Sequence, residues 1–376
     1  MSGAERNAHV YDVVVIGGGA AGVGVGVALK HAGIENFIIL ERLMIGASFL
    51  LWPSETRFIT PSFPSNSIGM LDLNAVALGA SPAFLLKVEH PSGEQFATHL
   101  NAVAEFYKLP VRSHAQVKKF TKPGQIFRMA VGQETLRAKH VVWAAGEFQF
   151  PSVNGFPGSD LCRHTATIPS YAELEGQDAI VIGGCESGFD AAYHLAQRNT
   201  PVRLFDTGCP WESESSDPSV GLSTFSLERA RDPRFVEQVQ LFPRTTVASV
   251  AREGNQYTVT TVDDRSFQTS MPPLLAAGFE GSHKLIPSLF ERRDDGYPLL
   301  TEHDESTITS GLFLCGPAVR HDNHIFCFIY KYRQRFAVVA KAIATSLGLE
   351  AEGLENYRKW GMYLDDLSCC GEECAC

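Results

Sequence analysis

The sequence has little positive charge: 32 lysine and arginine residues stand against 42 aspartate and glutamate residues, which gives a formal net charge of −10. No run of basic residues stands out. Because a nucleic-acid partner requires a concentration of lysine and arginine, this composition argues against that class of function. With 376 residues, of which 44% are hydrophobic and 20% charged, the chain is typical of a globular protein of two or three domains.

The sequence also lacks an uninterrupted membrane span. Residues 10–29 are almost wholly apolar, but Asp12 lies among them and glycine is too frequent for a simple span. No positively charged leader with a cleavage site accompanies this stretch. We therefore predict no association with a membrane and a cytoplasmic location.

A nucleotide-binding pattern is present near the start of the chain. Residues 11–16 are β-branched and apolar, as in a strand that is buried on both faces of a parallel sheet. They run into the glycine-rich sequence Gly-Gly-Gly-Ala-Ala-Gly at residues 17–22. A helix over residues 22–32 and a second apolar strand over residues 37–40 complete a βαβ unit.

The glycines of this turn have separate physical roles. Gly17 permits the tight turn, Gly19 lets the backbone approach a pyrophosphate, and Gly22 lets the helix pack closely on the strand. The N-terminus of the helix then offers free N–H groups and a favourable dipole to the phosphates. Glu41 ends the second strand, 19 residues after Gly22, where a carboxylate can bind ribose hydroxyls. The segment therefore predicts a dinucleotide site.

The same pattern occurs a second time. A strand over residues 179–182, a turn over residues 183–188 and a helix over residues 189–197 precede a strand over residues 202–205. The residues of this unit that we expect to bind a nucleotide are Gly183, Ser187, Gly188 and Asp206. We interpret the repeat as one internal duplication of a nucleotide-binding unit.

With both units in place, the chain resembles flavoproteins with two dinucleotide-binding domains, the superfamily of thioredoxin reductases and related pyridine-nucleotide disulfide oxidoreductases. The resemblance covers most of residues 9–348, and its matching segments are residues 13–22, Glu41, residues 141–146, 181–188 and 311–316, and Tyr332-Arg333-Gln334. It implies an α/β fold of two Rossmann-like three-layer nucleotide-binding domains, the second inserted into the first. We place an FAD-binding domain at residues 1–152 and 274–376, and an NAD(P)H-binding-like domain at residues 153–273.

The resemblance also implies cofactors and partners. FAD would bind the first turn, NAD(P)H would bind the second as electron donor, and relatives of this kind are often homodimers. The residues that the resemblance places near the flavin are Ala145, Gly146, Gly316, Arg333 and Gln334. Asp206 favours a free ribose 2′-hydroxyl over a 2′-phosphate, which favours NADH over NADPH. A second FAD, or no ligand, is the alternative for this second site.

Three departures from the family pattern bear on function. Cys185 stands at the middle glycine of the second turn, where a side chain obstructs a pyrophosphate. Pro317 follows Gly316, where the family usually has an aspartate that binds a ribityl hydroxyl. The active-site dithiol is missing, because residues 162–165 hold one cysteine and residues 42–60 hold none.

Cysteine is concentrated instead in a tail over residues 365–376. The cysteines of this tail are Cys369, Cys370, Cys374 and Cys376. They form a vicinal pair and a Cys-x-Cys pair, and we predict that they are catalytic thiols that relay electrons from the flavin. The alternatives are capture of a soft metal or metalloid ion and a tail without chemistry. Because the spacing matches no common zinc module, no metal site is predicted.

The predicted function is that of an FAD-dependent oxidoreductase, which passes electrons from NAD(P)H to a disulfide, a thiol or another small redox acceptor. One alternative is a flavin-dependent monooxygenase acting on a soft heteroatom, which needs no cysteine pair; another is a flavoprotein that binds metal through its tail. His321 and His324 are further candidates, as proton donors near the flavin, although two histidines in a loop are more often structural. Cys315 and Cys327 are interpreted as buried hydrophobic residues.

Overall fold

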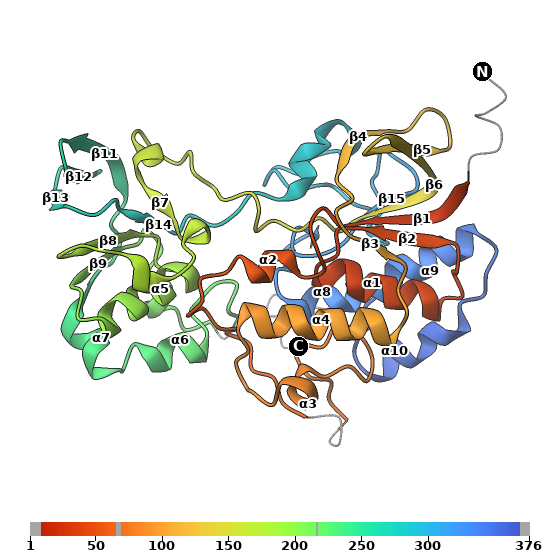
Figure 1. The fold of residues 1–376 in the computed structure, drawn as a ribbon, viewed down its shortest axis with the longest axis horizontal. Coiled ribbons are helices and arrows are strands. Elements are labelled where there is room, and N and C mark those ends of the chain that lie inside the picture. The colour runs from red at the N-terminus through yellow and green to blue at the C-terminus, as the bar shows by residue number, and fades with distance from the viewer. Residues whose placement is uncertain (1–8, 65–68, 216, 369–376) are drawn as a thin grey trace.

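Two sheets, one mixed and one parallel, form the framework of the protein, and they lie in separate halves of the molecule (Figure 1). The computed structural model describes residues 9–64, 69–215 and 217–368. The first sheet and most of the helices occupy one half, and the second sheet occupies the other.

The first sheet has seven strands. In spatial order they are β3 (Val111–Arg112), β2 (Phe37–Leu40), β1 (Val10–Ile16), β6 (Glu134–Trp143), β5 (Phe127–Val131) and β4 (Val117–Thr121), with β15 (Leu312–Leu314) also paired to β6. The first half of β6 pairs antiparallel with β5, and its second half pairs parallel with β1 and β15. As a result, the carboxyl ends of β1, β2, β6 and β15 meet at one edge, where α/β sheets bind their ligands.

Helices cover this first sheet. They are α1 (Ala20–His31), α2 (Ala47–Leu50), α3 (Pro82–Leu86), α4 (Gly93–Phe106), α8 (Ile329–Tyr332), α9 (Phe336–Ser346) and α10 (Glu355–Lys359). Helix α1 is buried from Ala20 to Leu29 and packs directly on α9, since a Cβ at Gly24 would lie 2.0 Å from the ring of Phe336. This packing fixes the N-terminus of α1 at the ligand edge of the sheet.

Residues 329–346 are helical throughout, but one turn in their middle is of the 3₁₀ type. Helix α8 ends at Tyr332, a 3₁₀ turn spans Arg333–Arg335, and α9 begins at Phe336. Both arginines are buried, with exposed fractions of 5% for Arg333 and 0% for Arg335. Their side chains bind carbonyl oxygens and a carboxylate of other segments, a requirement that helical periodicity does not reveal.

The second sheet is wholly parallel. Its strands, in spatial order, are β10 (Val239–Phe242), β9 (Val202–Phe205), β8 (Ala179–Ile182), β14 (Leu274–Leu275) and β7 (Arg163–His164). The accompanying helices are α5 (Glu186–Gln197), α6 (Thr224–Arg229) and α7 (Pro233–Gln238). Two small antiparallel sheets join β11 (Val247–Glu253), β12 (Gln256–Thr261) and β13 (Ser266–Thr269), and β16 (Arg320–His321) with β17 (His324–Ile325).

The second domain is inserted into the first. The chain leaves the first sheet after β6, builds the second sheet, and returns to the first sheet at β15. The two connecting segments are paired: Ser152 N donates to Gly278 O at 3.0 Å, and Glu280 N donates to Phe150 O at 2.7 Å. Because Leu274 and Leu275 belong to the second sheet, the boundary expected at residue 273 cuts through that sheet; we propose that the inserted domain ends after Leu275.

None of the helices in the described ranges is both long enough and apolar enough to cross a membrane. The apolar residues 10–29 instead form, one after another, β1, the glycine turn and most of α1.

Candidate functional site

The first glycine turn joins β1 to α1 in a geometry that only glycine satisfies at two positions. Gly17 has a φ of +112°, and a Cβ there would lie 2.3 Å from the carbonyl oxygen of Ala144. A Cβ at Gly22 would lie 1.8 Å from the carbonyl oxygen of Gly17. The fold itself therefore requires these two glycines, with or without a ligand.

Gly19 differs from both, because the backbone does not require a glycine there. Its φ is −82°, and no described atom lies within 4 Å of the Cβ position. Gly19, Ala20 and Ala21 line a cavity, so the start of the 12-residue helix α1 presents its free N–H groups to open space. This open cradle fits the pyrophosphate of a dinucleotide.

Glu41 lies at this turn, as the sequence predicts. The residue directly follows β2 and is buried, with 7% exposed. Its Oε2 accepts from Gly18 N at 2.7 Å, and its Oε1 accepts from Leu43 N at 2.8 Å. The carboxylate is thereby held beside the glycine turn, and its role with ribose hydroxyls stays a prediction.

The second turn repeats this geometry between β8 and α5. Gly183 has a φ of +101°, and a Cβ at Gly188 would lie 1.8 Å from the carbonyl oxygen of Gly183. Asp206 corresponds to Glu41, since its Oδ2 accepts from Gly184 N at 2.6 Å. The internal duplication therefore extends to the contact between the acid and the turn.

Cys185 occupies the position of Gly19 in this second turn. Its φ is −72° and that of Gly19 is −82°, so the backbone accommodates a side chain without strain. Cys185 is exposed and begins helix α5 as its N-cap. A side chain at this position of the turn is expected to hinder the approach of a pyrophosphate.

Replacing Cys185 with glycine is expected to strengthen the binding of the nicotinamide cofactor. Removing the side chain opens the approach to the start of α5, and we expect the KM for the preferred cofactor to fall by about tenfold, equivalent to ~1.4 kcal/mol. The measurement is the dependence of flavin reduction on NADH and NADPH concentration. A KM that stays the same or rises would show that the pyrophosphate does not bind at this turn.

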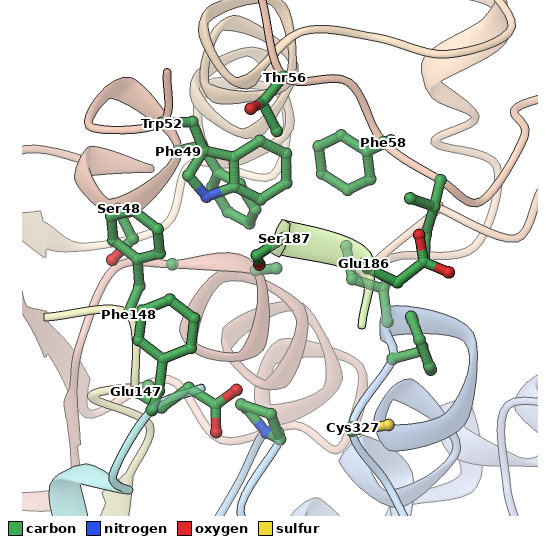
Figure 2. A pocket seen from close by; sticks show the side chains of 18 of the residues that line it. Ser48, Phe49, Trp52, Thr56, Phe58, Glu147, Phe148, Glu186, Ser187 and Cys327 are labelled. Atoms are coloured by element: carbon green, nitrogen blue, oxygen red, sulfur yellow. The ribbon is translucent and has the colours of Figure 1, made fainter. Parts of the chain in front are cut away.

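A cavity of about 350 Å³ lies between the two turns and connects them. The first turn contributes residues 19–21, and the start of α5 contributes Glu186 and Ser187. Figure 2 shows Phe49, Trp52 and Phe58 on one side of Ser187 and Phe148 on another. The cavity is thus built by both domains, and eight of the 29 residues that line it are aromatic.

The segment from Ser48 to Thr60 covers this cavity and binds the inserted domain. Thr56 Oγ1 donates to Asp190 Oδ2 at 2.7 Å, and Ser170 Oγ donates to Glu55 Oε1 at 2.5 Å. Lys331, from α8, places its Nζ 2.8 Å from each carboxylate oxygen of Asp217. These contacts hold the two turns on opposite sides of one cavity.

The residues expected near the flavin fall into two groups. Gly146 lines the cavity next to Ala145, and Gly316, with a φ of +113°, would bring a Cβ to 3.2 Å from that of Ala21. Arg333 instead donates from Nη1 to the carbonyl oxygens of Asp72 and Ala75. Gln334 Nε2 donates to Tyr330 O at 3.1 Å, and neither Arg333 nor Gln334 is among the residues that line the cavity.

The other candidates take varied positions. Cys369, Cys370, Cys374 and Cys376 lie outside the described residues. His321 is bound to Asp304, with Nε2 and Oδ1 2.5 Å apart, and His324 Nδ1 lies 3.1 Å from His321 O.

Cys315 is buried and Cys327 lines the cavity. Within the described part of the chain, no three His, Cys, Asp or Glu residues are grouped as a metal site would require.

Two functional features are not predicted by the sequence motifs. The aromatic wall comes from the irregular loop after β2, whose proline and aromatic content suggests only a pocket. Glu147 lines the cavity and directly follows Gly146 in the sequence. Its position next to a matched motif is the signal by which the sequence could have pointed to it.

Fold and site together define a class: proteins with two nucleotide-binding domains whose turns face a shared cavity. The family of pyridine nucleotide-disulphide oxidoreductases matches residues 14–316, and the chain belongs to that family. It is therefore an enzyme, an FAD-dependent oxidoreductase.

Individual relatives are distant. Bacilliredoxin reductase Bdr of Bacillus subtilis is 24% identical over 88% of this chain and 97% of its own length. An uncharacterized CzcO-like oxidoreductase of Geobacillus kaustophilus is 27% identical over 50% of this chain, which spans about half (52%) of that relative's length. The solved structure of bacillithiol disulfide reductase Bdr from Staphylococcus aureus aligns over 90% of this chain and 99% of its own, with a TM-score of 0.72 and 18% identity.

Proposed function

We propose that this enzyme transfers electrons from NAD(P)H through FAD to a small disulfide or a comparable small redox acceptor. The observation that carries the proposal is the cavity that the N-termini of α1 and α5 share. Two dinucleotides bound at these turns would direct their reactive rings into one enclosed aromatic space. The names of the Bdr relatives, which refer to bacilliredoxin and bacillithiol disulfide, support a disulfide as acceptor.

The residues of the chain have separable roles in this proposal. The start of α1 with Gly19 would hold the pyrophosphate of FAD, and Glu41 would bind its ribose. The start of α5 would hold NAD(P)H, with Asp206 favouring the free 2′-hydroxyl of NADH. Phe49, Trp52 and the rest of the aromatic wall exclude water from the space between them. When bound, FAD supplies the two-electron chemistry that links a hydride donor to a second acceptor.

The tail cysteines are proposed as the thiols that reach the acceptor. Within the described residues, the five cysteines are all unpaired, and they include no Cys-x-x-Cys. Two of these five are poorly suited to electron relay, because burial and the nearby Asp160 raise the pKa of Cys162 to about 12, and burial raises the pKa of Cys315 well above its usual value. Thiols of this kind react slowly at neutral pH, because the thiolate is the nucleophile.

Replacing Cys369, Cys370, Cys374 and Cys376 together with serine tests this role. We expect turnover of a disulfide to be abolished while NAD(P)H still reduces the flavin, because only the relay is removed. Steady-state disulfide reduction and anaerobic flavin reduction are measured on the same preparation. Cys162→Ser serves as control and should keep both activities; undiminished turnover in the fourfold variant would refute the relay.

A flavin-dependent monooxygenase acting on a soft heteroatom is the second candidate. The absence of a dithiol in the described part of the chain favours it, as does the aromatic enclosure of the cavity. Oxygen consumption in equal amount to a product that carries one added oxygen atom would support this candidate. Production of peroxide alone would not.

A further inference from the structure

The side chain of Glu147 brings a carboxyl group to the cavity, and the proposed binding of the two cofactors gives this group no role. It follows the turn at the carboxyl end of β6 and is partly buried. Figure 2 shows it beneath Phe148, on the side of the cavity opposite Thr56 and Phe58. Pro317 and Tyr332 line the same cavity, near the place where the first turn and Gly316 meet.

Three carboxyl groups line this cavity, and Glu147 is the one that has no fixed partner among the described residues. Glu186 accepts from Ser223 N at 2.5 Å and from Ser226 Oγ at 2.6 Å. Asp190 accepts from Thr56 Oγ1 and from Arg229 Nη1 at 2.6 Å. No described residue donates a hydrogen bond to the Glu147 carboxyl group, which is therefore free to exchange a proton with a ligand.

The cation near Glu147 is Arg320, whose guanidinium group donates its hydrogen bonds to backbone carbonyl oxygens. Arg320 Nη1 donates to Pro317 O at 2.6 Å and to Val319 O at 2.7 Å, and its guanidinium lies 4.2 Å from the ring centre of Tyr297. Burial raises the pKa of Glu147, and the Arg320 charge opposes that rise without cancelling it. Apolar surroundings thus keep the acid form of this side chain to a higher pH than in water.

The proposed reaction needs one proton that the electron donor does not supply. Reduction of a disulfide breaks one S–S bond and forms two S–H bonds, which consumes two electrons and two protons. Oxidation of NAD(P)H to NAD(P)⁺ delivers one hydride, which is equivalent to two electrons and one proton. The second proton must come from a group of the protein or from water.

We propose that Glu147 is the general acid that delivers this second proton at the flavin side of the cavity. The inference rests on the proposed function, because it assigns a residue to the same electron transfer. Two electrons from bound, reduced FAD would break the S–S bond; one sulfur would take the proton that arrived with the hydride, and the other would take the proton of the Glu147 carboxylic acid. The resulting carboxylate would take a proton back from water before the next cycle. General acids in such positions typically contribute a factor of about 10² to 10⁴.

The pH dependence follows from the acid form of Glu147. Reduction of the acceptor should slow as the pH rises through the pKa of Glu147, since the carboxylate cannot donate a proton. The titratable and charged groups around this cavity are Arg320 of β16, Cys315 just after β15, Cys327 before α8, Tyr332 of α8, Glu186 and Asp190 of α5, Tyr171, and Arg57 of the segment after β2. Burial raises the pKa of both Cys315 and Tyr332, so Glu147 is expected to titrate before either of them.

Glu147→Gln tests the proposal by separating the two half-reactions. NAD(P)H should reduce the flavin of this variant within about twofold of the wild-type rate, because hydride delivery needs no acid. Reoxidation by glutathione disulfide or cystine should fall by about 100-fold and lose its dependence on pH, and Glu147→Asp should restore part of it. Glu105→Gln, which removes a charge from an exposed position of α4, is the matched control. Wild-type reoxidation in Glu147→Gln would overturn the proposal.

An infrared difference spectrum provides a readout that does not depend on turnover. When dithionite reduces the wild-type protein at a pH low enough for Glu147 to be protonated, we expect a change in the C=O band of a protonated carboxyl group. That change should be absent in Glu147→Gln and present in Glu105→Gln; its presence in Glu147→Gln would overturn the assignment. If no disulfide reoxidises the wild-type protein, the proposed acceptor is wrong, and the infrared comparison still decides the role of Glu147.

Discussion

Gly19→Glu is expected to give a folded protein that no longer retains FAD. The φ of Gly19 is −82°, and a Cβ there meets no described atom within 4 Å, so the fold accommodates a side chain. The added carboxylate would occupy the space in front of α1 and repel the pyrophosphate from the free N–H groups. We expect affinity for FAD to fall at least about 100-fold, or ~2.7 kcal/mol.

Two further variants separate this effect from damage to the fold. Cys185→Glu places the same charge at the matching position of the second turn, and it should retain FAD. Gly22→Ala should instead destabilise the protein, because its Cβ would lie 1.8 Å from the carbonyl oxygen of Gly17. Flavin absorbance, FAD titration of apoprotein and circular dichroism distinguish the three. Tight FAD binding by folded Gly19→Glu would show that the dinucleotide lies elsewhere.

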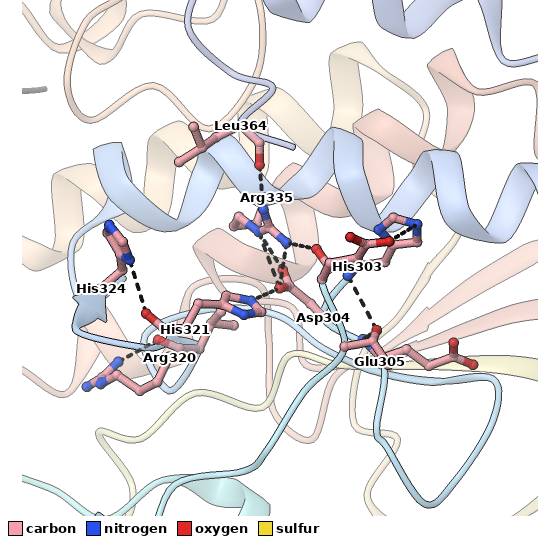
Figure 3. Close-up of polar contacts among 11 residues, drawn as sticks. His303, Asp304, Glu305, Arg320, His321, His324, Arg335 and Leu364 are labelled. Carbon is pink, nitrogen blue, oxygen red and sulfur yellow. Dashed lines mark hydrogen bonds and ion pairs between the residues drawn. The ribbon is translucent and has the colours of Figure 1, made fainter. Parts of the chain in front are cut away.

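Asp304→Ala is expected to cause a large loss of stability. Asp304 and Arg335 are fully buried, and Arg335 Nη2 lies 2.9 Å from Asp304 Oδ1 (Figure 3). Asp304 also accepts from His321, and Arg335 also binds the carbonyl oxygens of Glu302 and Leu364. Removing one partner of a buried ion pair leaves the other charge uncompensated, which typically costs about 3–5 kcal/mol.

Urea unfolding of Asp304→Ala and Glu134→Ala provides the comparison. Glu134 forms an exposed ion pair with Arg112 at 2.8 Å, and exposed pairs of this kind contribute little. We expect the midpoint of unfolding to fall strongly for Asp304→Ala and to change little for Glu134→Ala. Equal small shifts for the two variants would show that the buried network does not hold α9 to the loop before β15.

The contacts among Asp304, Arg335 and His321 also predict how the stability of the protein changes at acidic pH. Burial opposes ionisation of Asp304, but Arg335 and His321 outweigh it and lower the pKa of the carboxyl group. A carboxyl group whose pKa is lowered by folding stabilises the native state at neutral pH, and that contribution is lost as the pH falls through the lowered pKa. Asp304→Asn should therefore show a smaller loss of stability between neutral and acidic pH than the wild-type protein, as measured by urea unfolding at each pH. An equal loss in the two proteins would contradict this account of the network.

Local patterns in the sequence account for the central strands and both turns. The strands at residues 37–40, 179–182 and 202–205 have the predicted bounds, because short apolar runs between glycine turns leave little freedom. Gly17 and Gly183 adopt positive φ angles in matching turns, which the repeated motif requires. Such features depend on contacts within one βαβ unit, and the sequence of that unit contains the necessary information.

Features that depend on contacts across the chain were not predictable in the same way. The buried contact between Arg335 and Asp304 joins residues that lie 31 positions apart. The wall of the cavity joins Thr56 to Asp190 across 134 positions. Glu147 becomes distinctive only when its neighbours in the cavity are known, and these include Arg320 of β16, Pro317 and Tyr332 of α8.

The central claim is that a nicotinamide cofactor at the second turn reduces FAD at the first, and anaerobic stopped-flow absorbance tests it most directly. The FAD-loaded protein is mixed separately with NADH and with NADPH while the oxidised-flavin band is recorded. We predict rapid bleaching, faster with NADH because of Asp206, and slowed in Cys185→Glu although that variant keeps its flavin. No bleaching with either cofactor, from a protein whose flavin dithionite does reduce, would contradict the account.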